Sequence, residues 1–236
     1  MESSSSFSYN MRIELNHIVE FISLLAAIWN YKFLKGTIYE YFVWYIGFIL
    51  YAELGASYFK YALNHTYNMH IYLWVGIVDI SFKSYFLYSF IRSRIFKRII
   101  IVCASVIVCY FLFLFFFFQR FTELFYYGMS VGSYYLTLLC CVYFFELFVN
   151  SEEEILWSLP SFWIVAGTFI FFTGISLSFV MHKILAKPSV RIFNLPLYNF
   201  IPQLLSVILY GAYVVAFVLV KKKKQAQLLS SEFLRT

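Results

Sequence analysis

The chain has 236 residues, of which 62% are hydrophobic and only 13% are charged, whereas soluble domains carry about 25% charged residues. Phe (30 residues) and Tyr (21 residues) alone make up more than a fifth of the chain. This composition excludes a soluble globular domain and argues against a disordered chain, a disulfide scaffold and a nucleic-acid-binding protein, despite the formal net charge of +6. A polytopic membrane protein remains.

The N-terminal third is predicted to contain a short tail and three membrane spans. Residues 1–12 are polar and lack the basic stretch of a signal peptide, so we interpret them as a short extracytoplasmic tail. The next three apolar segments, at about 13–31, 38–59 and 70–90, each contain isolated ionisable residues. Because each is close to the 20 or so residues that cross a bilayer, all three are predicted to be spans.

The remaining chain contains four stretches without Asp, Glu, Lys or Arg, at 99–119, 124–145, 155–182 and 192–220. They predict four further spans, at about 99–118, 125–149, 159–182 and 197–220, followed by a basic cytoplasmic tail at 221–236. The continuous apolar run at 111–118 favours helices over the alternating strands of a β-barrel. The fold class expected is therefore an all-α membrane protein, a bundle of seven transmembrane helices spanning 13–220.

The distribution of Lys and Arg predicts the orientation of this bundle, because basic residues favour the cytoplasmic side. With seven spans, eleven basic residues fall on the face that carries the C-terminus, against six on the opposite face. We therefore expect the N-terminus outside and the C-terminus inside. The basic residues expected to contact lipid or a partner are Arg92, Arg94, Lys97, Arg98, Lys221, Lys222, Lys223 and Lys224.

Ionisable groups inside spans are costly and are functional candidates by default. His17 and Glu20 share one helix face, and Asp79 and Lys83 are four residues apart and can form a pair. Glu53 has no partner within its own helix, so it is expected to be neutral or paired with another helix. The alternative is that the His17–Glu20 and Asp79–Lys83 combinations are only self-satisfied polar pairs.

Polar residues near the start of the last span extend this candidate site. Asn199, Pro202 and Gln203 fall in its first two turns, where a proline loosens the backbone and frees a carbonyl. Such a segment could line a cavity open to the outside, although an ordinary packed helix is the alternative. The complete candidate intramembrane polar site is His17, Glu20, Glu53, Asp79, Lys83, Asn199 and Gln203.

Other residues are interpreted as structural. Gly167 and Gly174 lie seven residues apart on one face and would let two helices approach closely. Aromatic residues near the predicted span ends resemble an interfacial belt, Tyr41, Trp44 and Tyr45 among them. The sequence contains no phosphate-binding loop, no hydrolase motif and no cluster of metal ligands, so no catalytic residue, cofactor or metal is expected.

Several segments of the chain form a pattern in a sequence rich in Phe, Tyr, Ile and Lys. These segments are 21–25, 41–51 followed by Glu53 and Gly55, 160–164 with Gly167, 197–199 leading to 208–210, and the basic tail. In this pattern the whole chain resembles a recurrent group of small, largely uncharacterised seven-transmembrane-helix proteins of Bacteroidetes. The resemblance implies a bacterial inner membrane, and, because proteins of this group are often encoded near histidine kinases, a role in signalling.

Three functions are compatible with these observations. The first is a non-enzymatic sensor or accessory protein that passes an outer-side stimulus to a cytoplasmic partner such as a histidine kinase. The second is a small-molecule transporter with a path lined by Glu53, Asp79 and Lys83. The third is an intramembrane lipid hydrolase with Glu53 or Asp79 as general base, which would need a second carboxylate or a histidine within hydrogen-bond reach.

Overall fold

The computed structural model describes residues 14–62, 65–117, 122–150, 156–181, 191–192 and 195–233. Almost all of these residues are helical. The elements are α1 (Leu15–Trp29), α2 (Tyr31–Leu34), η1 (Ile38–Glu40), α3 (Tyr41–Ala62), α4 (His65–Phe90), α5 (Arg94–Phe117), α6 (Thr122–Asn150), η2 (Leu156–Ser158), α7 (Pro160–Val180), β1 (Arg191–Ile192), β2 (Leu195–Pro196) and α9 (Leu197–Phe233).

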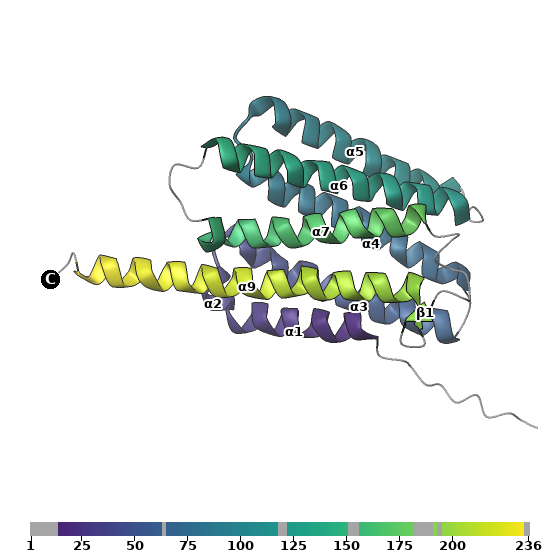
Figure 1. Ribbon diagram of the computed structural model, residues 1–236, viewed down its shortest axis with the longest axis horizontal. Coiled ribbons are helices and arrows are strands. Elements are labelled where there is room, and N and C mark those ends of the chain that lie inside the picture. Colours follow the sequence, from purple (N-terminus) through teal and green to yellow (C-terminus); the bar gives the residue numbers. More distant parts are fainter. Residues whose placement is uncertain are drawn as a thin grey trace, which may run out of the picture.

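The long helices run along one common direction, and α1 begins at the opposite end of the bundle from the end of α9 (Figure 1). We call these the Glu14 end and the Lys221 end. Contacts between α1, α9, α7, α6, α4 and α3, in that order and back to α1, close a ring of six helices. Helix α5 lies outside this ring against α4 and α6.

Five of the described helices (α3, α5, α6, α7 and α9) are long and apolar enough to cross a membrane. The prediction of a helical, multi-pass membrane protein is therefore supported. The two other predicted spans also coincide with helices but fall short of this measure. Helix α1 has only 15 residues, and α4, with 26 residues, is long enough but contains more polar residues, including Asp79 and Lys83.

The first helix ends earlier than its predicted span, and the chain turns before α3. The Ala26 carbonyl accepts hydrogen bonds from both the side chain (2.8 Å) and the backbone N–H (3.1 Å) of Asn30, so Asn30 reinforces the last turn of α1. Gly36 then adopts a φ of +76°, a conformation that suits glycine because it has no Cβ. The Glu40 carboxylate holds this turn by accepting hydrogen bonds from the Gly36 N–H (2.8 Å) and the Tyr31 hydroxyl (2.9 Å).

The last helix continues past its predicted end at 220. Helix α9 runs without interruption to Phe233, because the sequence after Val220 contains good helix formers and neither Gly nor Pro. Lys224 donates a hydrogen bond to the Lys35 carbonyl (2.8 Å), and the Lys221 ammonium lies 5.7 Å from the centre of the Phe33 ring. The basic segment predicted as a tail is thus the last part of a helix that contacts the turn before α3.

Glu146 fastens α6 to the start of α5. Its carboxylate accepts hydrogen bonds from the backbone N–H groups of Arg92 (2.6 Å) and Ser93 (3.1 Å), directly before α5 begins. The first N–H groups of a helix have no partner within the helix, and an anion at this position is favoured. Glu146 therefore stabilises the N-terminus of α5.

Two glycines of α7 permit close packing against α9. A Cβ at Gly167 would lie 2.7 Å from the Cβ of Ala212, and one at Gly174 would lie 2.5 Å from Leu205. The predicted role of these two glycines in close helix approach is confirmed, with α9 as the partner of α7.

We expect Gly167→Ala to lower the free energy of unfolding by about 1–3 kcal/mol, because the added methyl group overlaps a Cβ that cannot rotate away. Gly211→Ala is the matched control, since no atom lies within 4 Å of the Cβ it would add, and it should be neutral or stabilising. Thermal unfolding of both variants in the same detergent provides the comparison. Equal stability of the two variants would contradict this packing.

Candidate functional site

A cavity of about 590 Å³ lies between the helices of the ring. It is not fully enclosed, and it reaches the Glu14 end, because Glu14, Tyr126 and Phe179 belong to its lining. At its other limit the cavity is lined by Lys83. Lys83 follows His65, the first residue of α4, by 18 residues, which corresponds to about 27 Å along the helix axis. Its volume falls within the range of small-molecule sites in proteins.

The structure brings most of the candidate polar residues to this one cavity. Glu20, Glu53, Asp79, Lys83 and Gln203 all contribute to its lining, from α1, α3, α4 and α9. Pro202, Ser206 and Tyr210 line it as well, so the start of α9 faces a cavity as its polar residues indicate. Asn199 lies in α9, but its side chain is outside the described part of the structure.

Asp79 and Lys83 form the predicted pair at the deep limit of the cavity. The Lys83 ammonium lies 2.8 Å from Asp79 Oδ1 and donates a second hydrogen bond to the Tyr45 hydroxyl (2.6 Å). The Tyr45 hydroxyl in turn donates to Asp79. Lys83 is only 4% exposed, and it also lies 4.6 Å from the centre of the Phe172 ring. The three polar groups therefore satisfy one another within an aromatic surrounding.

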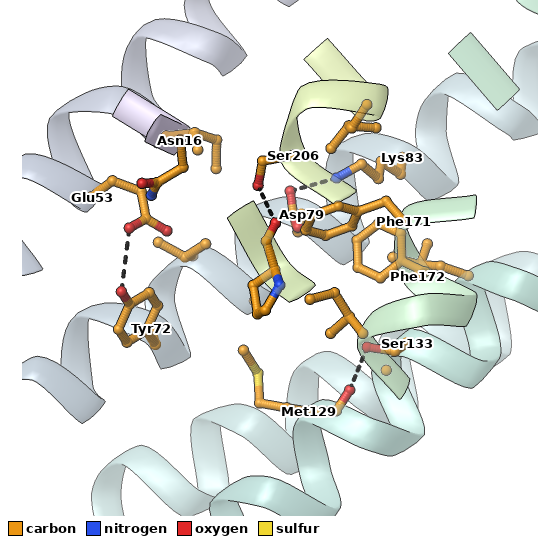
Figure 2. Close-up of a pocket in the computed structure, with 18 of the residues that line it drawn as sticks. Asn16, Glu53, Tyr72, Asp79, Lys83, Met129, Ser133, Phe171, Phe172 and Ser206 are labelled. Carbon is orange, nitrogen blue, oxygen red and sulfur yellow. Dashed lines mark hydrogen bonds and ion pairs between the residues drawn. The ribbon is translucent and has the colours of Figure 1, made fainter. Parts of the chain in front are cut away.

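Glu53 has a partner on another helix, which is one of its two expected states. It accepts a hydrogen bond from the Tyr72 hydroxyl of α4 (3.2 Å). Figure 2 shows this pair at one side of the cavity and the Asp79–Lys83 pair at the other, beside Phe171 and Phe172. Nearer the Glu14 end, Gln203 donates a hydrogen bond to Glu14 Oε2 (3.3 Å).

Glu20 and Asn16, one turn apart on α1, present acceptors that no described protein group satisfies. Glu20 is 2% exposed, and its Oε2 is buried without a hydrogen-bond partner, as is Asn16 Oδ1. Both residues line the cavity. The Tyr210 hydroxyl lies near the Glu20 carboxyl group. The carboxyl groups of Glu53 and Asp79 are close enough to interact electrostatically with Glu20. Buried acceptors of this kind normally have partners.

His17 is buried but does not belong to the cavity lining. Its Nδ1 accepts a hydrogen bond from the Glu14 N–H (3.1 Å), and its Nε2 lies 3.1 Å from the Ser57 hydroxyl. Because both ring nitrogens are engaged by protein groups, His17 is not placed to act as a base with Glu53 or Asp79. This arrangement weakens the hydrolase hypothesis.

A cluster of aromatic rings lies between the cavity and the Lys221 end. Phe42 packs edge-to-face against Phe82, Phe86, Tyr213 and Phe217, with ring centres 4.8 to 5.9 Å apart. Tyr45 stacks on Phe82 at 4.2 Å. We call these six residues the aromatic seal. Its rings come from α3, α4 and α9, so it joins one side of the ring of helices to the other.

Sequence reasoning missed several lining residues, and Tyr45 most clearly. We expected Tyr45 in an interfacial belt with Tyr41 and Trp44, and this prediction was wrong. Tyr41 and Trp44 are exposed, as a belt requires, but Tyr45 is buried at the deep limit of the cavity. The available signal was its spacing, because Tyr45 shares the buried face of α3 with Phe42 and Ile49.

The predicted lipid or partner surface is partly engaged within the molecule. Lys97 lies 4.8 Å from the centre of the Tyr88 ring, and Lys221 and Lys224 contact the turn before α3. The side chains that remain exposed on this basic surface are Arg92, Arg94, Arg98, Lys222 and Lys223. They lie near the Lys221 end, directly before α5, in its first turns and in the last part of α9.

Within the described residues, no group of three or more His, Cys, Asp or Glu side chains is arranged to hold a metal ion. The chain matches no family model, no curated protein and no solved structure. The geometry of the cavity and its lining therefore carries the functional argument.

Proposed function

We propose that the protein is a seven-span membrane protein of a bacterial inner membrane, with the Glu14 end outside, and that its cavity binds a small solute from that side. In this proposal it is a non-enzymatic sensor, which passes the effect of binding to a cytoplasmic signalling partner such as a histidine kinase. The observation that supports this proposal most is the cavity, which reaches the Glu14 end and has the aromatic seal beyond its other limit.

Two features support seven spans where composition alone indicates five. Helices α1 and α2 follow each other with only Asn30 between them and together cover residues 15–34, a length close to that of a span. In α4, the charges of Asp79 and Lys83 are paired inside the bundle and do not face lipid. An odd number of spans agrees with the separation of the two ends in Figure 1.

Helix α9 provides the route for a signal. Gln203, Ser206 and Tyr210 line the cavity, Tyr213 and Phe217 belong to the aromatic seal, and the basic end follows in the same helix. A solute that binds differently to two positions of α9 would shift the population between them. The exposed basic end would then present a different surface to a partner.

Co-purification from native membranes in mild detergent tests the sensor proposal. We expect a signalling protein to accompany the wild-type chain in a constant ratio, and Lys222→Glu with Lys223→Glu to weaken this association, because both side chains are exposed. Recovery of the chain without any signalling protein would contradict the proposal.

A transporter is the second candidate, and the depth of the Asp79–Lys83 pair supports it. The pair and Tyr45 lie where the cavity meets the aromatic seal, the position at which a solute would have to pass. Uptake of radiolabelled amines, sugars and amino acids into proteoliposomes tests this function. Uptake that is unchanged in Glu53→Gln and Asp79→Asn would exclude a path along these residues.

A further inference from the structure

Two residues that line the cavity carry a hydrogen-bond acceptor without a partner among the described protein groups. Asn16 Oδ1 and Glu20 Oε2 are buried and unsatisfied by any described protein group, and both belong to residues of the lining. An acceptor deprived of both water and a protein donor costs free energy. A ligand that brings N–H donors to this side of the cavity would remove that cost.

The charge of the wall has the sign that matches such a donor. The lining contains four carboxyl groups, those of Glu14, Glu20, Glu53 and Asp79, and one amino group, that of Lys83. Lys83 is held by Asp79 and Tyr45. Because a cleft lined mainly by one kind of charged group attracts ions of the opposite sign, this excess of acidic groups favours a cation over an anion.

The rest of the lining is apolar and aromatic. Phe111, Phe171, Phe172 and Phe179 contribute rings to it, and Ile49, Val75 and Leu209 are among its aliphatic members. Aromatic faces attract cations as well as apolar groups. The cavity therefore suits a molecule with one cationic end and one apolar end.

We propose that the cavity is a binding site for a small organic cation, in which a protonated amine donates hydrogen bonds to Glu20 and Asn16 while its apolar part packs against the phenylalanine rings. This assignment rests on the proposed function, in which the cavity binds a small solute, and it specifies the chemical class of that solute. A primary amine fits better than a quaternary ammonium, because only the former has N–H donors for the two acceptors.

Isothermal titration of the purified, nanodisc-embedded chain with four related probes tests this assignment. The probes are 2-phenylethylamine, its N,N,N-trimethyl derivative, 2-phenylethanol and 3-phenylpropionate. We expect 2-phenylethylamine to bind most tightly. The affinity of the trimethyl derivative and that of the alcohol should each be lower by a factor of about ten or more. The trimethyl derivative lacks the N–H donors, and the alcohol lacks the charge. The carboxylate should not bind.

Variants locate the amine within the cavity. Glu20→Gln should lower the affinity for 2-phenylethylamine by a factor of about ten or more. Asn16→Ala should also lower this affinity, because it removes the second acceptor. Glu40→Gln is the matched control, because Glu40 lies in the turn before α3, outside the cavity lining, and it should bind as the wild type does. The unfolding temperature of each variant shows that it is folded before titration.

Three results would overturn the assignment. Equal or tighter binding of the alcohol or the carboxylate would show a solute site of another chemical class and would leave the proposed function standing. Unchanged binding in both folded variants would place the amine elsewhere. Absence of binding by all four probes would overturn the organic-cation site itself, while co-purification of a signalling partner tests the sensor role separately.

Discussion

Breaking the Asp79–Lys83 pair from one side alone is expected to lower the free energy of unfolding by about 3–5 kcal/mol. Asp79→Asn leaves the Lys83 ammonium buried at 4% exposure without its counter-ion. Lys83→Met removes one of the two donors to Asp79 Oδ1 and leaves the Tyr45 hydroxyl as the other. In both variants an uncompensated charge remains inside the bundle, which costs more than the pair itself contributes.

The double variant Asp79→Asn, Lys83→Met separates this explanation from simple loss of packing. Because the double variant removes both charges together, its loss of unfolding free energy should be much smaller than the sum of the two single losses. This loss should be no larger than that of either single variant. Unfolding in mixed detergent micelles measures all three. Additive losses would mean that the two charges do not depend on each other, contrary to their 2.8 Å separation.

Phe42→Ala is expected to have a comparably large effect, about 3–5 kcal/mol, because it leaves a cavity in the middle of the aromatic seal. Phe42 is only 1% exposed and makes ring contacts with residues of both α4 and α9. Removal of its ring should also join the solute cavity to the Lys221 end, so that water enters the bundle from both sides.

Phe48→Ala is the matched control for this variant. It removes the same group from the same helix, but Phe48 is 38% exposed on the outer face of the bundle. It should cost far less in stability and leave the seal intact. If both variants lose equal stability under the same denaturation conditions, the rings around Phe42 do not form a stabilising seal.

The general class of the protein is readable from its sequence because composition and hydropathy act over long segments. Low charge and long apolar runs led directly to a helical membrane protein. The boundaries of helices α5 to α7 lie within about five residues of the predicted spans. The Asp79–Lys83 pair was also predictable, since partners four residues apart on one helix meet regardless of the tertiary fold.

The remaining features of the site depend on contacts between helices, which sequence spacing does not contain. Glu53 meets Tyr72, and His17 meets Ser57, only because α3 lies beside both α4 and α1. Asn16 is an ordinary polar residue in the sequence, and only its burial beside the cavity makes its oxygen notable. The extension of α9 to Phe233 was missed because the charges at 221–224 indicate the end of a span but not the end of a helix.

The placement of the cavity and of the basic end on opposite sides of one membrane is tested most directly by thiol labelling of intact cells. In a chain whose four native cysteines are replaced by alanine, Gln203→Cys places a thiol in the cavity lining, and Lys222→Cys places one on the exposed basic end of α9. We predict that a membrane-impermeant maleimide labels Gln203→Cys in intact cells and labels Lys222→Cys only after permeabilisation. Labelling of both thiols in intact cells, or of Gln203→Cys only after permeabilisation, would contradict this arrangement.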